Sequence, residues 1–159
     1  MTSNLSQFIK FLKEEISENQ ISSANTIDVI DPRDRLENKS EICVKPKNTQ
    51  EISKILKLAN KFIIPIIPIG GSTGLVGGQI ASQSNHVTLS LEKLDTINFY
   101  KESNLLYVQS GAILSNIKKL AFNNGRLFPL SLASEGSCQI GGNLATNAGG
   151  LNVIKYGNV

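Results

Sequence analysis

Two glycine-rich segments carry the residues with the clearest chemistry in this chain. The first runs from Pro68 to Gly78 (PIGGSTGLVGG) and the second from Ser134 to Gly150 (SEGSCQIGGNLATNAGG). Glycine lets backbone N–H groups come close to a ligand, at an entropic cost of about 1 kcal/mol per ordered position. Two such segments in one chain therefore predict backbone contact with a large ligand.

The first segment has the composition of an anion-binding loop. Residues Gly70 to Gly74 follow an expected strand, and successive backbone N–H groups in such a turn can surround an anion. The hydroxyls of Ser72 and Thr73 would add two donors. The pyrophosphate of a dinucleotide is the natural ligand for this arrangement, although a purely structural glycine turn is an alternative that these residues leave open.

Two common phosphate-binding loops do not fit the first segment. A Walker-type loop needs Lys and then Ser or Thr after its last glycine, whereas Gly74 is followed by Leu75 and Gly78 by Gln79. A Rossmann fingerprint needs a third glycine three residues after the second, and then a helix. Residues 81–85 (ASQSN) are instead rich in turn formers, so both of these nucleotide-binding folds are disfavoured.

The second segment predicts a flat, polar surface. Most of its side chains are small or carry hydroxyls, and Asn143 and Asn147 supply amide donors and acceptors. Such a surface suits one face of a planar heteroaromatic ring whose nitrogens and carbonyls pair with backbone and amide groups. A flavin fits this description, whereas a sugar or peptide groove would carry more aromatic or charged residues.

Hydrophobic periodicity predicts the elements that must position these segments. Asn48 followed by Glu51 has the spacing of a helix N-cap with its reciprocating acid. After Gly125 no period is sustained, and the whole pattern indicates a mixed α and β domain. In chain order we expect a helix from Leu5 to Ile16, an irregular connector over 18–40, a strand at 42–44, a helix beginning at Asn48, strands at 63–67, 86–91, 96–100 and 105–109, and a helix from Ile113 to Ala121.

Composition narrows the functional classes further. With 159 residues and 40% hydrophobic content the chain can bury a core, and its net charge of +3 is spread without the dense basic run of a nucleic-acid-binding protein. Cys43 and Cys138 are far apart, which disfavours a disulfide framework or a zinc site. No signal peptide or membrane span is evident. We therefore expect a cytoplasmic protein, or one held at a membrane surface by a partner.

From Glu41 to the last residue the chain carries a series of motifs, in the order VKPKNTQEISKIL, IPIIPIGGSTGLVGG, LSLEKLDTI, LLYVQSGA, LFPLSLASEGSCQIGGNLATNAGG and KYGNV. Their order and spacing resemble the FAD-binding (PCMH-type) domain of the vanillyl-alcohol oxidase type. The resemblance is nearest to the branch of the glycolate oxidase flavin subunit, the D-lactate dehydrogenases and D-2-hydroxyglutarate dehydrogenase. It implies an α+β fold with the first α/β subdomain and the start of the second, divided into an N-terminal helix and connector (1–40) and an FAD-binding domain incomplete at its C-terminus (41–159).

The resemblance implies noncovalent FAD. Ser72 stands where some relatives attach the cofactor through a histidine, and Ile69 stands where many carry arginine. His86 is expected to be an ordinary strand-end residue and Cys138 a small residue packed under the cofactor. The positions that match the family's cofactor-binding residues are Gly70, Gly71, Ser72, Thr73, Gly74, Leu75, Gly78, Gln79, Ser134, Gly136, Ser137, Ile140, Gly141, Asn143, Asn147, Gly149 and Gly150.

By the same resemblance, the chain is the FAD-binding portion of a D-2-hydroxy-acid dehydrogenase or oxidase, in which hydride passes from substrate C2 to flavin N5. The family's cap domain, with its substrate-binding basic residues, has no counterpart here. We therefore assign no catalytic residue and no metal ligand, and expect Arg33, Arg35 and Arg126 to be solvated charges or members of surface ion pairs rather than a substrate clamp. The chain alone is expected to be inactive, and to associate through uncovered surface or with a partner chain. The alternatives are a non-enzymatic flavin-binding fragment or relic, and another FAD enzyme of the same fold such as an enolpyruvyl-sugar reductase.

Overall fold

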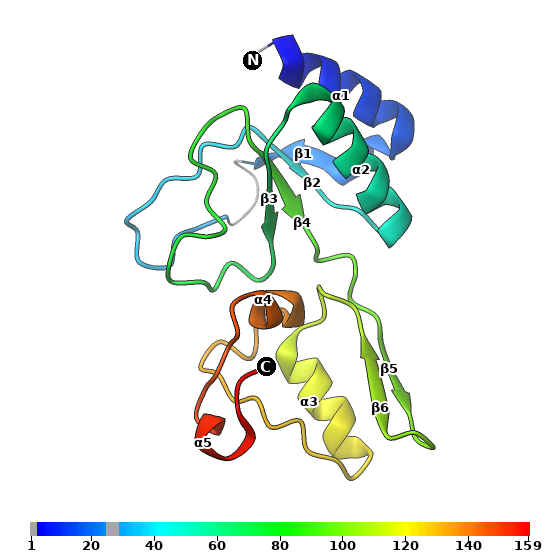
Figure 1. Cartoon of the computed structure of the whole chain (residues 1–159), viewed down its shortest axis with the longest axis vertical. Helices are drawn as coiled ribbons and strands as arrows, with labels where there is room; N and C mark the ends of the chain where they lie inside the picture. Colours follow the sequence, from blue (N-terminus) through cyan, green and yellow to red (C-terminus); the bar gives the residue numbers. More distant parts are fainter. Residues whose placement is uncertain (1–2, 25–28) are drawn as a thin grey trace.

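The computed structural model describes residues 3–24 and 29–159, and it forms an upper and a lower unit (Figure 1). Its helices are α1 (Ser3–Glu15), α2 (Thr49–Phe62), α3 (Leu114–Asn123), α4 (Ile140–Ala145) and α5 (Val153–Tyr156), with a short 3-10 helix η1 (Glu18–Gln20). Its strands are β1 (Ile21–Ser23), β2 (Ile42–Val44), β3 (Ile66–Ile69), β4 (Val87–Ser90), β5 (Ile97–Tyr100) and β6 (Leu105–Val108).

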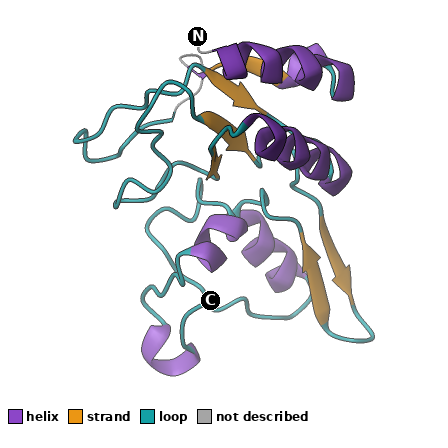
Figure 2. Ribbon diagram, turned by 45° about the horizontal axis from the view of Figure 1, so that its top comes forward, coloured by secondary structure: helices purple, strands orange, loops and turns teal. Residues whose placement is uncertain are grey.

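The upper unit is a four-stranded sheet in the order β1-β2-β4-β3. Strands β2, β4 and β3 run parallel, and β1 is antiparallel to β2. The helices α1 and α2 pack against each other and cover the sheet (Figures 1 and 2). Alternate strand residues such as Val87 and Leu89 form one buried core with Phe8 of α1 and Ile55 of α2, because strand side chains alternate between faces.

The lower unit consists of the antiparallel hairpin β5–β6 with α3, α4 and α5. One face of the hairpin, including Ile97 and Val108, packs on the buried Ile117 of α3. In Figure 2 the chain passes from β4 in the upper unit to β5 in the lower unit through a loop. A different loop follows β3 and returns to β4 within the upper unit, and in Figure 1 it lies next to α4. A Cβ on Gly71 of this loop would meet Ser137, so the glycine-rich segments come together between the units.

The helices and strands expected between Leu5 and Ala121 are present, with three differences. The strand expected at 63–67 is β3 at Ile66–Ile69, because α2 runs on to Phe62 and Ile63 ends it in the left-handed conformation, with a φ of 55°. Asn48 accepts from the Glu51 N–H at 2.8 Å, as expected of an N-cap. The Glu51 carboxylate, however, accepts from the backbone N–H of Lys47 at 2.8 Å rather than from that of Asn48.

The third difference is in the 18–40 connector, which was expected to be irregular throughout. It contains η1 and the strand β1, which pairs with β2 in the register Ser22 to Cys43. Beyond Gly125, where no periodicity was found, the chain forms the short helices α4 and α5. Helix α4 includes Gly141 and Gly142. Because glycine has a low helix propensity, the sequence pattern did not predict a helix there.

Candidate functional site

The two glycine-rich segments line opposite walls of one cleft of about 370 Å³. The second segment contributes small residues of α4 and the turn after it, among them Gly142, Ala145 and Ala148. Nine of the predicted site residues line it, namely Gly70, Gly71, Ser72, Thr73, Gly74, Gly78, Gln79, Ser134 and Asn143. The fold therefore brings together two segments about sixty residues apart in the sequence.

The other predicted site residues do not line this cleft. They are Leu75, Gly136, Ser137, Ile140, Gly141, Asn147, Gly149 and Gly150. Several of them have a packing role instead. Ile140 is buried in the lower core, and Gly141 lies so close to Ser110 that an added Cβ would meet the Ser110 Cβ at 2.7 Å. Gly150 has a φ of 101°, which other residues rarely adopt.

The walls of the cleft touch each other at Gly71. A Cβ at this position would lie 1.9 Å from the carbonyl oxygen of Ser137 and 3.1 Å from the Cα of Cys138. No side chain fits between these backbones, so glycine is required by close approach rather than by backbone conformation. This contact sets the spacing between the first and second segments.

The connector that precedes β2 braces the first segment through hydrogen bonds. The Ser72 hydroxyl accepts from the N–H of Ile30 at 3.2 Å and donates to its carbonyl at 3.1 Å. The guanidinium of Arg35 donates to the carbonyl of Leu75 at 2.6 Å, and Gln79 donates to that of Gly74 at 2.8 Å. The Ser72 hydroxyl, expected to be a ligand donor, is thus engaged within the protein.

A buried carboxylate organises this connector. Asp31 accepts from the backbone N–H groups of Arg33 at 3.2 Å and Arg35 at 3.0 Å, and lies 3.5 Å from the Arg35 guanidinium. Burial by itself raises the pKa of Asp31, but these hydrogen bonds and the charge of Arg35 outweigh it, so the pKa is lowered. Arg35, expected from the sequence to be a solvated charge or part of a surface pair, is half exposed and paired with Asp31, and it also braces the first segment.

The second segment is attached to the lower unit by its backbone. Leu114 donates to the carbonyl of Cys138 at 3.1 Å, Ile140 to that of Ala112 at 2.9 Å, and Gly141 to that of Ser110 at 2.8 Å. An ion pair joins Lys118 of α3 to Glu135 of this segment. Because one wall belongs to each unit, the cleft depends on how the two units are held together.

The wall formed by α4 holds two polar groups that lack partners. Gln139 and Asn143 both line the cleft and are only 9% and 6% exposed. Among the described residues, neither side-chain oxygen has a hydrogen-bond partner. An unpaired buried carbonyl is costly, so these groups fit a ligand that supplies hydrogen-bond donors. Together with the flat floor of small residues, they suit the flavin dinucleotide that the sequence predicts. Gln139 was absent from the predicted residues.

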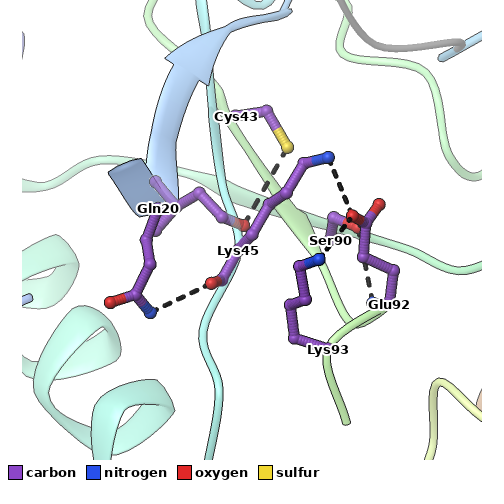
Figure 3. A network of polar contacts seen from close by, with 7 residues as sticks. Gln20, Cys43, Lys45, Ser90, Glu92 and Lys93 are labelled. Carbon is purple, nitrogen blue, oxygen red and sulfur yellow. Dashed lines mark hydrogen bonds and ion pairs between the residues drawn. The ribbon is translucent and has the colours of Figure 1, made fainter. Parts of the chain in front are cut away.

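A network of charged residues lies at the carboxyl ends of β2 and β4 (Figure 3). The ammonium of Lys45 is 2.9 Å from the Glu92 carboxylate, which also accepts from the Ser90 hydroxyl at 3.2 Å. Burial raises the pKa of Glu92, but Lys45 and Ser90 outweigh it and lower the pKa. Nearby, burial raises the pKa of the Cys43 thiol to about 11. Glu92 is held as a paired carboxylate, which does not suit a general base.

Cys138 and His86 have the surroundings of structural residues. Cys138 lines the cleft, but it is buried and packs with Leu114 and Leu130. His86 directly precedes β4, away from the cleft, and its carbonyl accepts from the Ser40 hydroxyl at 3.0 Å. In residues 3–24 and 29–159, no three His, Cys, Asp or Glu side chains gather as metal ligands. No helix in the same ranges is long and apolar enough to cross a membrane.

Comparison with known proteins adds to this geometry. Residues 40–159 match the FAD binding domain family. The chain is 35% identical over 162 residues to the mitochondrial D-2-hydroxyglutarate dehydrogenase of Arabidopsis thaliana, covering 97% of this chain and 28% of the relative. It is 40% identical over 114 residues to D-2-hydroxyglutarate dehydrogenase of Xanthomonas citri, covering 71% of this chain and 24% of the relative.

The chain thus spans about a quarter of the length of these relatives. Among solved structures, alkyldihydroxyacetonephosphate synthase superposes with a TM-score of 0.82 at 20% identity, covering 97% of this chain and 34% of that protein. Identity at this level shows the fold alone. These matches confirm the α+β fold and the FAD-binding resemblance expected from the sequence.

Proposed function

Because the chain belongs to the FAD binding domain family, we propose that the cleft between its two glycine-rich segments holds FAD noncovalently. The observation that carries this assignment is the pair of buried side-chain oxygens of Gln139 and Asn143, which lack a hydrogen-bond partner among the described residues and belong to residues in the wall of the cleft. The backbone of Gly70 to Gly74 would hold the pyrophosphate from the opposite wall. The small residues Gly142 and Ala145 would support the flat ring.

The second part of the proposal concerns the reaction. We assign the chain to a flavin-dependent D-2-hydroxy-acid dehydrogenase or oxidase of the D-2-hydroxyglutarate, D-lactate or glycolate type. The identity to D-2-hydroxyglutarate dehydrogenases along most of this chain supports this assignment. When bound, FAD would supply the hydride acceptor. The residues of this chain bind and orient the cofactor and limit its access to water, while the base and the substrate-binding cations would come from another domain.

FAD binding is tested by titrating the purified chain with FAD and following the quenching of flavin fluorescence. We expect saturable binding at one site, and release of free FAD on denaturation because the attachment is noncovalent. ADP should compete, since it carries the pyrophosphate that the first segment would hold. A chain that folds cooperatively but binds no FAD would refute the assignment of the cleft.

The reaction is tested in a chimera in which this chain replaces the matching segment of the Xanthomonas citri enzyme. We expect the bound flavin to bleach when D-2-hydroxyglutarate, D-lactate or glycolate is added without oxygen, and to stay oxidised with NADPH. Reduction by NADPH would favour an enolpyruvyl-sugar reductase type. A chimera that holds FAD but is reduced by none of these would favour a flavin-binding protein without this chemistry.

The third part of the proposal concerns the cellular location. The sequence favours the cytoplasm, whereas the Arabidopsis thaliana relative is named as mitochondrial. Fractionation of the source cells followed by immunoblotting would distinguish these two compartments. We propose the cytoplasm for this chain, with any attachment to a membrane made through a partner protein.

A further inference from the structure

We propose that Gln139 and Asn143 act as a carboxamide pair that hydrogen-bonds the flavin half of the bound cofactor and so contributes to the choice of ligand. This inference rests on the proposed binding of FAD in the cleft. Asn143 was expected to belong to the site from sequence, whereas the role of Gln139, and the pairing of the two, come from the structure.

The backbone places the two carboxamides on the same wall. Gln139 is the N-cap residue of α4, and Asn143 follows four residues later, donating its N–H to the Gln139 carbonyl at 3.2 Å. Residues spaced by four in a helical turn lie above one another on one face. Across the cleft, Gly70 lies against the Gln139 side chain, so that a Cβ at position 70 would be 3.3 Å from the Gln139 Oε1.

A third carboxamide shows how this fold treats such a group when no ligand is needed. Gln20 is 4% exposed, similar to Asn143. Its side chain donates to the Lys45 carbonyl at 3.1 Å and to the Glu51 carboxylate at 2.6 Å, and its oxygen accepts from the Ser17 N–H at 3.2 Å. Ser22, His86 and Thr88 also have a buried side-chain atom without a partner, but none of them lines the cleft, so what distinguishes Gln139 and Asn143 is that both line this one cleft.

The chemistry of the unpaired atoms indicates which part of the cofactor they would meet. Both are carbonyl oxygens, which accept hydrogen bonds, so the partner must be a donor. The pyrophosphate of FAD offers only acceptors at neutral pH, and it would repel these oxygens. Donors are offered by the adenosine half, in its amino group and ribose hydroxyls, and by the flavin half, in the hydroxyls of its sugar-alcohol chain and a ring N–H flanked by two carbonyls. We place the contact on the flavin half, and competition by ADP tests that choice. A carboxamide matches that ring edge, because it presents an acceptor and a donor side by side.

The first test compares stability in the absence of ligand. Gln139→Met keeps the length of the side chain and removes the unpaired carbonyl, so the ligand-free variant should melt at a higher temperature than the wild type. Gln20→Met is the matched control, since it removes a carboxamide whose hydrogen bonds are made, and it should melt at a lower temperature. A ligand-free Gln139→Met chain that loses stability as Gln20→Met does would overturn the proposal, because its carboxamide would then be paired within the protein.

The second test measures binding. Gln139→Met and Asn143→Leu should each weaken FAD binding about three- to tenfold, the effect of one hydrogen bond, while competition by ADP stays unchanged. Gln20→Met should bind FAD as the wild type does. Unchanged FAD binding by both variants would refute the proposal, as would a loss of ADP binding by the same factor, which places the contact on the nucleotide half. If the wild-type chain itself binds no FAD, the proposed function fails, and this inference fails with it.

Discussion

Substitution of Gly71 by alanine tests the claim that direct backbone contact sets the spacing of the cleft. The added Cβ would lie 1.9 Å and 2.8 Å from the carbonyl oxygen and carbon of Ser137. Both are backbone atoms, so no side-chain rotation relieves the overlap, and the two walls must separate by about 1 Å or more. Overpacking of this kind costs about 1–3 kcal/mol. In a chain of this size the melting temperature should fall by about 2–12 °C.

Gly78→Ala is the matched control, because Gly78 also lines the cleft but a Cβ there would meet no atom within 4 Å. Its expected effect on the ligand-free chain is neutral or a gain of up to about 1 kcal/mol. Thermal denaturation followed by circular dichroism gives both melting temperatures, and an FAD titration should show affinity lowered about tenfold or more in Gly71→Ala. If Gly71→Ala melts within about 1 °C of the wild type and binds FAD equally well, the contact described at Gly71 is wrong.

Three further predictions address the surroundings of the cleft. Asp31→Asn should loosen the connector and weaken FAD binding about threefold in a titration, whereas the exposed Asp34→Asn should not, and equal binding by both would contradict the bracing role. Because the pKa of Glu92 is lowered from its ordinary value of 4.5, its carboxylate stabilises the fold at pH values above 4.5, and this contribution is lost as the pH falls through the folded-state pKa. In melting experiments at acid pH, Glu92→Gln should therefore lose less stability below pH 4.5 than the wild type does. An equal loss in both proteins would contradict the stabilising role of the Glu92 carboxylate. In a Cys138→Ala chain, Cys43 should react with a thiol reagent at about pH 8 only after unfolding, since it is buried and its pKa is about 11, and rapid reaction of the native chain would be inconsistent with its position.

The sequence predicted the elements that depend on local signals. Asn48 and Glu51 mark the start of α2 through a cap that involves neighbouring residues only. The polar turn from Lys101 to Asn104 likewise located β5 and β6, because it joins two short runs of strand-forming residues. The start of β3 was misplaced, because Ile63, a residue type that disfavours the left-handed conformation, adopts it directly after α2, and the strand begins only at Ile66.

The parts that could not be predicted depend on contacts between distant segments. The brace on the first glycine segment uses the backbone N–H and carbonyl of Ile30. Almost any residue type can make these two hydrogen bonds, so the sequence gives no sign of them. Helix α4 forms in spite of Gly141 because that glycine packs against Ser110, and propensity cannot register such a contact. Gln139 had one usable signal, a carboxamide four residues before another in the same glycine-rich stretch. Its burial without a partner becomes visible only in the folded chain.

The position of Pro68 has a consequence for how the chain meets other copies of itself. Strand β3 lies at one end of the β1-β2-β4-β3 sheet, and its residue Ile69 accepts from Leu91 on the β4 side. Backbone groups alternate in direction along a strand, so Pro68 directs its nitrogen away from the sheet, where it has no hydrogen to offer an incoming strand. A row of free donors at this edge would recruit further strands and seed fibrils. The proline interrupts that row immediately before the glycine loop, so the strand that leads to the cofactor cleft is also protected from edge-to-edge aggregation.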